Sequence, residues 1–299
     1  MATLREIRRR VTSVKSTQKI TKAMKMVAAA KLRRAQDALV STRPYARKMN
    51  GLLRRLVTKI DLSIHPLLKE REVKHVLLVV VSGDRGMCGA FNGNVIKAAI
   101  DHMNSQYRHL LKEPDGVRIV TVGKKSTDFL SKRNYILYSK HVGIFGSLHF
   151  GHARTIIQQI VDQYLKGEYD KVEVVYNEFK SVIQQRIVVE QVLPILPEQI
   201  QETKDIHALA QVDYIYEPSI REIIDVLLPI HLNFQMWRIL LESSTAEEGA
   251  RMTAMSNATE NAKELIRDLT LSYNKERQAS ITKELLEIVS GAEALKKAS

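Results

Sequence analysis

The sequence predicts an α/β protein with long helices, in which an antiparallel coiled coil of the N- and C-terminal helices carries an inserted α/β domain. Two observations support this fold class. Apolar residues recur every three or four positions near both ends of the chain, which is the spacing of an amphipathic helix. Between these ends, short β-branched runs alternate with helical stretches, a pattern typical of a mostly parallel sheet.

The N-terminal segment, residues 1–62, is predicted to be one coiled-coil helix. It has no glycine before Gly51, and from Leu32 to Ile60 its apolar positions alternate steps of three and four. That alternation is a heptad seam. As a helix, the periodic stretch from Leu4 to Ile60 spans roughly 85 Å at about 1.5 Å per residue. Pro44 interrupts the seam, and because the phase is the same on both sides we expect a kink rather than two helices.

Residues 73–216 are predicted to form the α/β domain. The first apolar run, HVLLVVVS at residues 75–82, does not alternate with polar residues. This is expected of a strand that is buried on both faces. Further strands are predicted at residues 118–122, 171–176 and 185–193, and helices at residues 92–111 and 148–165.

The C-terminal segment, residues 218–295, returns to the helical pattern and spans on the order of 100 Å. Ser219 and Glu222 have the spacing of a capping box. A seam runs from Met252 to Tyr273 and continues in shifted phase from Ile281 to Leu295. We expect Pro229 to bend this helix and Gly291 to stop it. The two helices leave one domain in opposite directions, so they can bury their seams against each other as an antiparallel pair.

Composition excludes several classes of protein. The chain has 299 residues, 44% of them hydrophobic, and its single cysteine excludes an internal disulfide framework and a cysteine-built zinc site. No apolar run approaches the ~20 residues that span a bilayer.

Charge is concentrated in the first fifth of the chain. Residues 1–60 hold 17 Lys and Arg against two acidic residues, whereas the other 239 residues hold 29 basic and 31 acidic residues. Such an uneven distribution of charge indicates an acidic partner, which could be nucleic acid, a membrane surface or an acidic protein. The cations lie all around the seam and only Tyr45 is aromatic there, which favours an acidic protein surface over nucleic acid.

The remaining motifs do not predict an enzyme. The turn at residues 83–92 follows the first strand where an α/β domain binds phosphate, but its glycines are spaced GxxGxxG, and we interpret it as a tight turn. The GKKS run at residues 123–126 places Lys125 where a phosphate-binding loop needs Ser or Thr. His149 and His152 lack a third metal ligand, and nothing marks Cys88 as a nucleophile.

Three separated stretches resemble one known family. Residues 20–29 (ITKAMKMVAA), 84–92 (DRGMCGAFN) and 277–292 (RQASITKELLEIVSGA) are similar to the gamma subunit of F-type ATP synthases. Met87, Ala90 and Phe91 depart from that family's Asp-Arg-Gly-Leu-Cys-Gly-Gly-Leu-Asn turn. The resemblance extends over nearly the whole chain.

The resemblance implies a fold and a function. The terminal helices would form the rotor shaft inside a hexamer of alpha and beta subunits. The Rossmann-like central domain would bind no nucleotide and would rest with the epsilon subunit on the membrane c-ring. The chain would be a non-catalytic subunit without cofactor, metal or nucleic acid, on the cytoplasmic side of a bacterial inner membrane. With Cys88 alone, it lacks the cysteine pair of chloroplast members.

The resemblance also implies a set of residues that contact the hexamer. They would act as polar catches and pivots for the partner subunits, not as catalysts. On the N-terminal helix they are Arg8, Arg9, Met24, Lys25 and Arg33, and on the C-terminal helix they are Arg251, Arg277, Gln278, Thr282 and Glu284.

Overall fold

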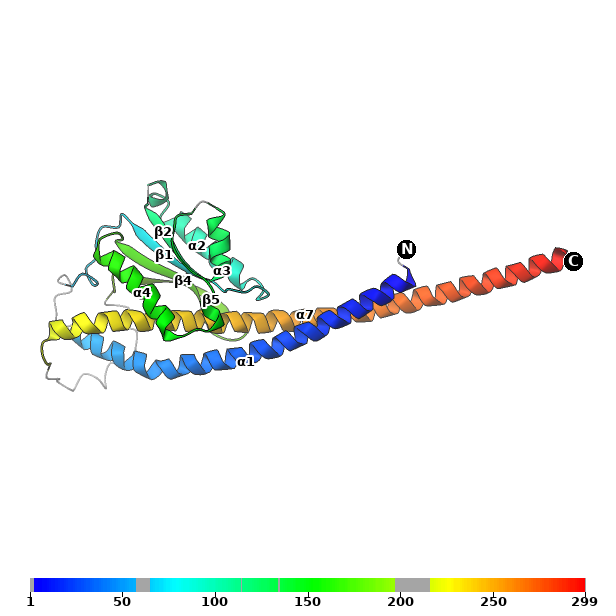
Figure 1. Cartoon of the computed structure of the whole chain (residues 1–299), viewed down its shortest axis with the longest axis horizontal. Coiled ribbons are helices and arrows are strands. Elements are labelled where there is room, and N and C mark those ends of the chain that lie inside the picture. Colours follow the sequence, from blue (N-terminus) through cyan, green and yellow to red (C-terminus); the bar gives the residue numbers. More distant parts are fainter. Residues whose placement is uncertain (1–2, 58–64, 114, 134, 197–215, 299) are drawn as a thin grey trace. The chain divides into compact units, whose positions relative to one another are not determined.

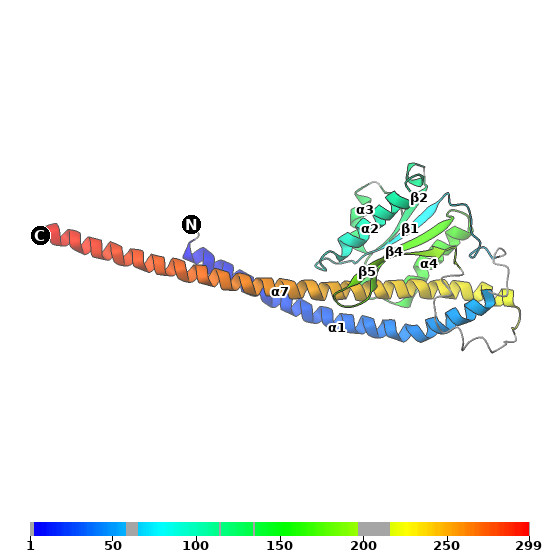
Figure 2. The same cartoon turned by 180° about the vertical axis from the view of Figure 1, so that it is seen from behind.

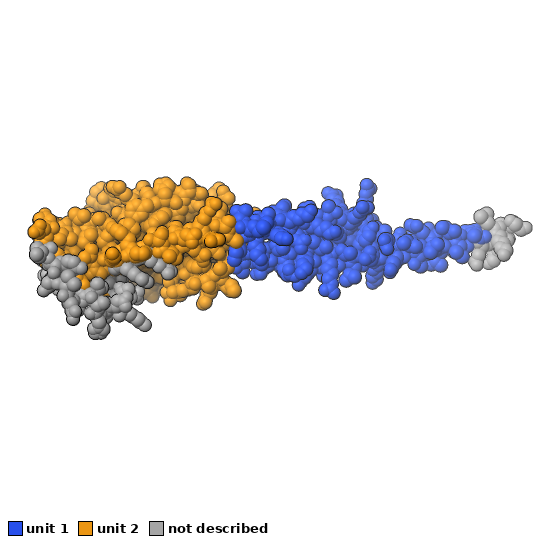
Figure 3. Space-filling model, turned by 90° about the horizontal axis from the view of Figure 1, so that it is seen from below, with its two compact units in different colours: residues 1–28, 252–299 blue, residues 29–251 orange. Residues whose placement is uncertain are grey.

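The computed structural model describes residues 3–57, 65–113, 115–133, 135–196 and 216–298. Its contacts divide the chain into two compact units, coloured separately in Figure 3. Unit 1 consists of Met1–Ala28 and Met252–Ser299, and unit 2 of Ala29–Arg251. This division differs from the three predicted segments, because parts of both terminal helices group with the central domain.

The two terminal helices are the longest elements of the chain (Figure 1). Helix α1 (Leu4–Val57) continues through Pro44, as the unchanged seam phase predicted, while Ile60 lies outside the described residues. Helix α7 (Ile220–Ala298) continues through Pro229. The prediction that Gly291 stops α7 was wrong. Gly291 has no positive φ, and without the left-handed backbone of a helix C-terminus it is one more helical residue.

Unit 2 contains a mostly parallel sheet, as predicted, and this sheet has five strands where four were predicted. Its order is β3-β2-β1-β4-β5, in which only β4 and β5 pair antiparallel. The strands are β1 (Val76–Val81), β2 (Val117–Val122), β3 (Leu137–His141), β4 (Lys171–Phe179) and β5 (Gln185–Leu193). The sequence analysis missed β3, an edge strand whose five residues are at most half-buried and so carry little apolar signal.

Helices cover both faces of this sheet (Figures 1 and 2). Helices α2 (Phe91–Gln106) and α3 (Lys124–Ser131) pack on the face that includes Leu78 and Val80 of β1. Helix α4 (Phe150–Leu165) packs on the opposite face, which includes Leu77 and Val79. Short 3-10 helices lie at Leu110–Lys112 and Ile144–Gly146.

Unit 2 also contains residues 29–57 of α1 and 220–251 of α7, which run antiparallel. Tyr45 stacks on Phe234 with ring centroids 4.1 Å apart, and Lys31 lies near Glu248. The seam is buried as predicted, with Leu53 of α1 and Leu232 of α7 fully enclosed in the same core as α4.

Unit 1 contains the other parts of the same two helices, again antiparallel. The Thr21 and Thr259 hydroxyls are 2.8 Å apart, and Lys25 donates a hydrogen bond to Ser256 at 2.9 Å. Ile7 and Met255 are buried in the seam. Beyond Tyr273 the stripe that continues the seam is exposed, at Ile281, Leu285 and Ile288. The side chain of Leu295 lies outside the described residues.

Candidate partner-contact surface and the glycine-rich turn

The predicted contact residues fall into three groups. Arg8, Arg9, Met24 and Lys25 lie on α1 in unit 1, and Arg277, Gln278, Thr282 and Glu284 lie on α7 in unit 1. Arg33 and Arg251 belong to unit 2. Eight of the ten side chains are exposed, Met24 is half-buried and Arg251 is buried.

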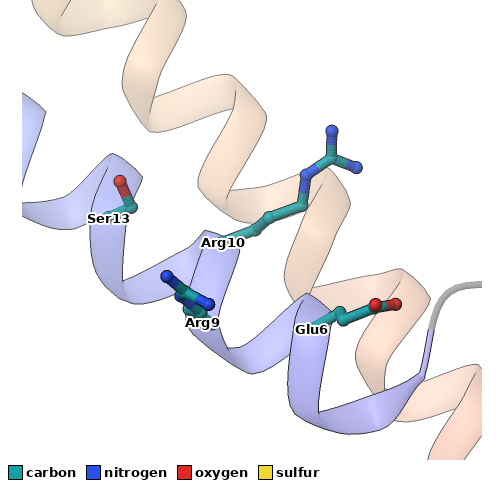
Figure 4. Close-up of a pocket in the computed structure, with 4 residues that line it drawn as sticks. All are labelled: Glu6, Arg9, Arg10 and Ser13. Carbon is teal, nitrogen blue, oxygen red and sulfur yellow. The ribbon is translucent and has the colours of Figure 1, made fainter.

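The exposed cations of α1 in unit 1 form a basic stripe, which we define as the eight Lys and Arg residues between Arg5 and Lys25. Among the described residues, none of them forms an ion pair within the chain. The acid of this stretch, Glu6, instead accepts a hydrogen bond from the Thr3 backbone N–H at 2.9 Å. Figure 4 shows Arg9 and Arg10 extending from the helix beside Glu6 and Ser13, around a shallow hollow. The stripe is therefore an unneutralised positive surface.

Among the described residues, the predicted contact residues near the C-terminal end of α7 bond only within their own helix. Thr282 donates a hydrogen bond to the Gln278 carbonyl at 3.0 Å, and Ser280 donates one to Glu284 at 3.4 Å. Arg277 and Gln278 extend exposed side chains. Because these side chains pack little against the rest of the chain, they are available to a partner.

Arg251 is placed differently from the other predicted contacts. Only 8% of the residue is exposed, and its guanidinium bonds to Glu247 and, at 2.7 Å, to Glu248. Burial alone would lower the pKa of Arg251, but Glu247 and Glu248 outweigh it and raise that pKa. Partner contact by Arg251 stays a prediction, while its described bonds all point into unit 2.

The glycine-rich turn lies at the carboxyl end of β1, where an α/β sheet would bind a phosphate. Here a carboxylate already occupies the backbone amides. Asp84 accepts hydrogen bonds from the N–H groups of Lys124, at the start of α3, and of Gly143 and Phe145, at 2.8 to 3.1 Å. A second carboxylate, that of Glu247, lies against Gly83. The arrangement repels a phosphate, so the turn is a structural joint.

Local backbone geometry explains the glycines of this turn in two ways. Gly89 has φ +60°, a conformation that favours glycine. Gly83 is needed for space instead, because an added Cβ would lie 2.6 Å from the Glu247 carboxyl carbon. Met87 adopts φ +60° without being glycine and is exposed at the tip. The tight-turn interpretation is confirmed in geometry, with close approach as an additional reason.

Residues of the GKKS run and of the histidine pair make contacts within unit 2. Ser126 of the GKKS run is buried and hydrogen-bonded to Ser82 at 2.9 Å. His149 and His152 stack with ring centroids 3.7 Å apart. Among the described residues, no group of three or more His, Cys, Asp or Glu side chains could hold a metal ion.

Comparisons with known proteins find relatives that match nearly the full length of the chain. The family model described as ATP synthase matches residues 3–295. An ATP synthase gamma chain of Chlorobium phaeobacteroides (strain BS1) is 52% identical over 99% of both chains. That of Chlorobaculum tepidum is 53% identical over 99% of this chain and 100% of its own length. The chain belongs to the ATP synthase gamma chain family.

Solved structures agree with this family on the fold. The central stalk of the Tetrahymena thermophila mitochondrial ATP synthase is similar at a TM-score of 0.59 and 26% identity, covering 80% of this chain and 99% of its own. A rotor chain of the Euglena gracilis mitochondrial ATP synthase gives a TM-score of 0.63 at 21% identity, over 93% and 98% of the two chains. As a gamma chain, the protein is a central-stalk subunit of an F-type ATP synthase and not its catalytic site.

The gamma chain also contains a partly buried polar cluster that the sequence analysis missed. Arg238 of α7 bonds to Glu190 of β5 at 2.5 Å, and Tyr176 and Gln235 each donate to Glu190 at 2.8 Å. Burial lowers the pKa of nearby His231 to about 4. A sequence signal existed, since residues 231, 235, 238 and 242 are polar at steps of four, three and four inside an apolar helix.

No helix in the described part of the gamma chain is long and apolar enough to cross a membrane.

Proposed function

We propose that the gamma chain turns as a shaft, transmitting rotation between a membrane c-ring and a hexamer of alpha and beta subunits. Its epsilon partner would bind beside the sheet domain at the ring, on the cytoplasmic side of a bacterial inner membrane. The relatives that support this placement are bacterial gamma chains, and the Tetrahymena structure is of a central stalk with its c-ring.

The basic stripe is the observation that carries this proposal. The eight cations form no ion pair with the residues that the structure describes, which favours an acidic partner surface around the helix. Exposed charge contacts are weak individually and are screened by salt. A rotating shaft needs such shallow contacts, because deep anchors would hold it at one angle. A nucleic-acid-binding function has no support from the family or the relatives.

Coupling would follow from differential contacts. A shaft that touches each surrounding subunit differently at a given angle shifts the open–closed equilibrium of each catalytic site by its difference in affinity for the two states. Reciprocally, nucleotide binding at those sites drives the shaft. The chain itself would supply no catalytic group.

Substitutions at the α7 contact residues test the coupling role. We expect Arg277→Gln and Gln278→Ala to lower ATP-driven ion pumping relative to ATP hydrolysis in the reconstituted complex. Both side chains are exposed, so the thermal unfolding of the isolated chain should not change. Lys275→Gln is a matched control for Arg277→Gln, because two residues along a helix point to roughly opposite faces. Full pumping efficiency in both test variants would contradict the assignment.

A second experiment tests the partners. The tagged chain should bring alpha, beta, epsilon and ring subunits out of native membranes in mild detergent, together with ATPase activity that the isolated chain lacks. Recovery of nucleic acid in place of these subunits would count against the shaft.

A further inference from the structure

We propose that Arg251 is a positioning residue that fastens the helix pair of unit 2 to the sheet domain through the glycine-rich turn. The fastening, here called the Arg251 clamp, consists of Lys31, Gly83, Glu247, Glu248 and Arg251. Its role as a torque-bearing joint rests on the proposed function, because only a turning shaft loads it.

The helix side of the clamp joins α1 to α7. Glu247 and Glu248 occupy successive positions of α7, and the Arg251 guanidinium bonds to both of their carboxylates. Glu248 also lies 3.9 Å from the Lys31 ammonium of α1. Two acids and two bases balance one another. Glu247 and Arg251 are 5% and 8% exposed, so this pair lies largely away from water, where an unpaired charge is costly.

The turn side of the clamp is a contact between side chain and backbone. The three atoms nearest to a Cβ built on Gly83 all belong to the Glu247 carboxylate, at 2.6 to 2.8 Å. Beside it, Cys88 and Phe91 of the turn pack on Ala246 of α7. Arg251 holds the Glu247 carboxylate, and that carboxylate lies directly on the turn.

The turn distributes this contact to the sheet. The Gly83 N–H donates a hydrogen bond to Asn92 Oδ1 at 2.8 Å, which ties the turn to the start of α2. Asp84 accepts from amides that follow β2 and β3. A force on α7 at Glu247 therefore reaches the turn through the contact with Gly83, and the carboxyl ends of three adjacent strands through the hydrogen bonds of Asp84.

The position of the Glu247 carboxylate depends on the positive charge of Arg251. The second oxygen of Glu248, Oε2, is buried and has no hydrogen-bond partner, so this carboxylate depends on the cations beside it. Burial raises the pKa of the Glu247 carboxyl, and Arg251 opposes that rise. Without the guanidinium, the two buried carboxylates repel each other and Glu247 loses its fixed position against Gly83.

Two substitutions should break the clamp from its opposite sides. Arg251→Gln removes the cation, and Gly83→Ala places a methyl group where the Glu247 carboxylate lies. In the full chain, we expect either change to speed amide hydrogen exchange in residues 83–92 about tenfold or more, because losing one partner of a buried pair is strongly destabilising. In the reconstituted complex, both should lower ion pumping relative to ATP hydrolysis.

The double variant distinguishes the clamp from a partner contact. If both residues act through one joint, Arg251→Gln with Gly83→Ala should pump no worse than the poorer single variant. Arg267→Gln, an exposed arginine on the same helix, is the matched control and should change neither readout. Arg251→Lys keeps the charge without the two-armed geometry and should rescue part of the effect.

Three results would overturn the proposal. Reduced pumping by Arg251→Gln with unchanged exchange at residues 83–92 would make Arg251 a partner contact. Additive pumping losses in the double variant would mean two separate functions, and unchanged pumping despite faster exchange would mean that the clamp bears no torque. If either single variant does not fold, Arg251→Lys and Lys31→Gln replace it in the same cycle. Failure of the unsubstituted chain to restore pumping would instead overturn the proposed function.

Discussion

The first half of α7, residues 220–251, and its second half, residues 252–298, belong to one continuous helix but are built differently. In the first half Leu228, Leu232, Met236, Ile239 and Leu240 are all fully buried. In the second half, among the described side chains, the buried apolar residues are Met255 and Ala262. Charged groups differ in the same direction, since Arg238 and Arg251 are paired within unit 2, whereas Arg277 is exposed and forms no ion pair with the described residues.

This difference separates stability from recognition along one helix. Burial of apolar area stabilises by roughly 25 cal/mol per Å², so the first half contributes most of the folding free energy of α7. The second half leaves its side chains to water or to a partner. Helix formation is therefore a shared property of both halves, while the surroundings decide what each half does.

The largest expected effect is the loss of a core side chain in the first half. Leu240→Ala should lower the free energy of unfolding by about 2–5 kcal/mol, because it removes buried methyl groups and leaves a cavity. Leu271→Ala in the second half, where Leu271 is 60% exposed, should change it by less than about 0.5 kcal/mol. Urea unfolding of both variants measures the contrast, and equal losses would remove the distinction between the halves.

A smaller effect depends on pH in the first half. Burial first, and Arg238 second, lower the pKa of His231 from 6.5 to about 4, while Glu190 opposes them. The unfolded chain then binds a proton below pH 6.5 that the folded chain refuses until pH 4, so stability is lost as pH falls through this window. The loss attributable to His231 is up to about 3 kcal/mol.

The measurement is urea unfolding at steps between pH 7.5 and pH 4.5, for the native chain and for His231→Gln. We expect the native chain to lose stability more steeply than the variant. Parallel curves would show that folding does not lower the pKa of His231.

The smallest effect belongs to a surface ion pair of the second half. Lys263 and Glu260 are 3.0 Å apart with side chains 68% and 61% exposed. Lys263→Gln should cost no more than about 0.5 kcal/mol, and raising the salt concentration should erase the difference. A larger, salt-independent loss would mean that the second half also relies on internal charge pairs.

The long helices and most of the sheet were predictable because their signals are local and repeated. Leu32, Leu39, Leu53 and Leu56 lie in a seam that repeats many times, and the structure buries all four. Strand β3 was missed because its residues lie at the sheet edge. Helix α3 was missed because its first three residues, 124–126, were weighed as part of a phosphate-binding loop.

The polar interior was harder to predict, since it depends on residues far apart in sequence. Glu190 and Arg238 are 48 positions apart, and the local sequence around each residue does not indicate the other as its partner. Arg251 was predicted to contact a partner subunit, yet it lies four residues before Met255, which faces the seam. That spacing indicates the buried face. Burial of Arg251 was therefore predictable from the periodicity, and its contact with a partner subunit stays a prediction.

The exposed apolar stripe near the end of α7 has a consequence for the cell. Ile281, Leu285 and Ile288 expose 48%, 57% and 68% of their area, on a helix that carries no local cover among the described residues. Exposed apolar patches promote self-association. A surplus of this chain over its assembly partners would then be a proteostatic burden, and balanced synthesis of the subunits would matter for viability as well as for energy conversion.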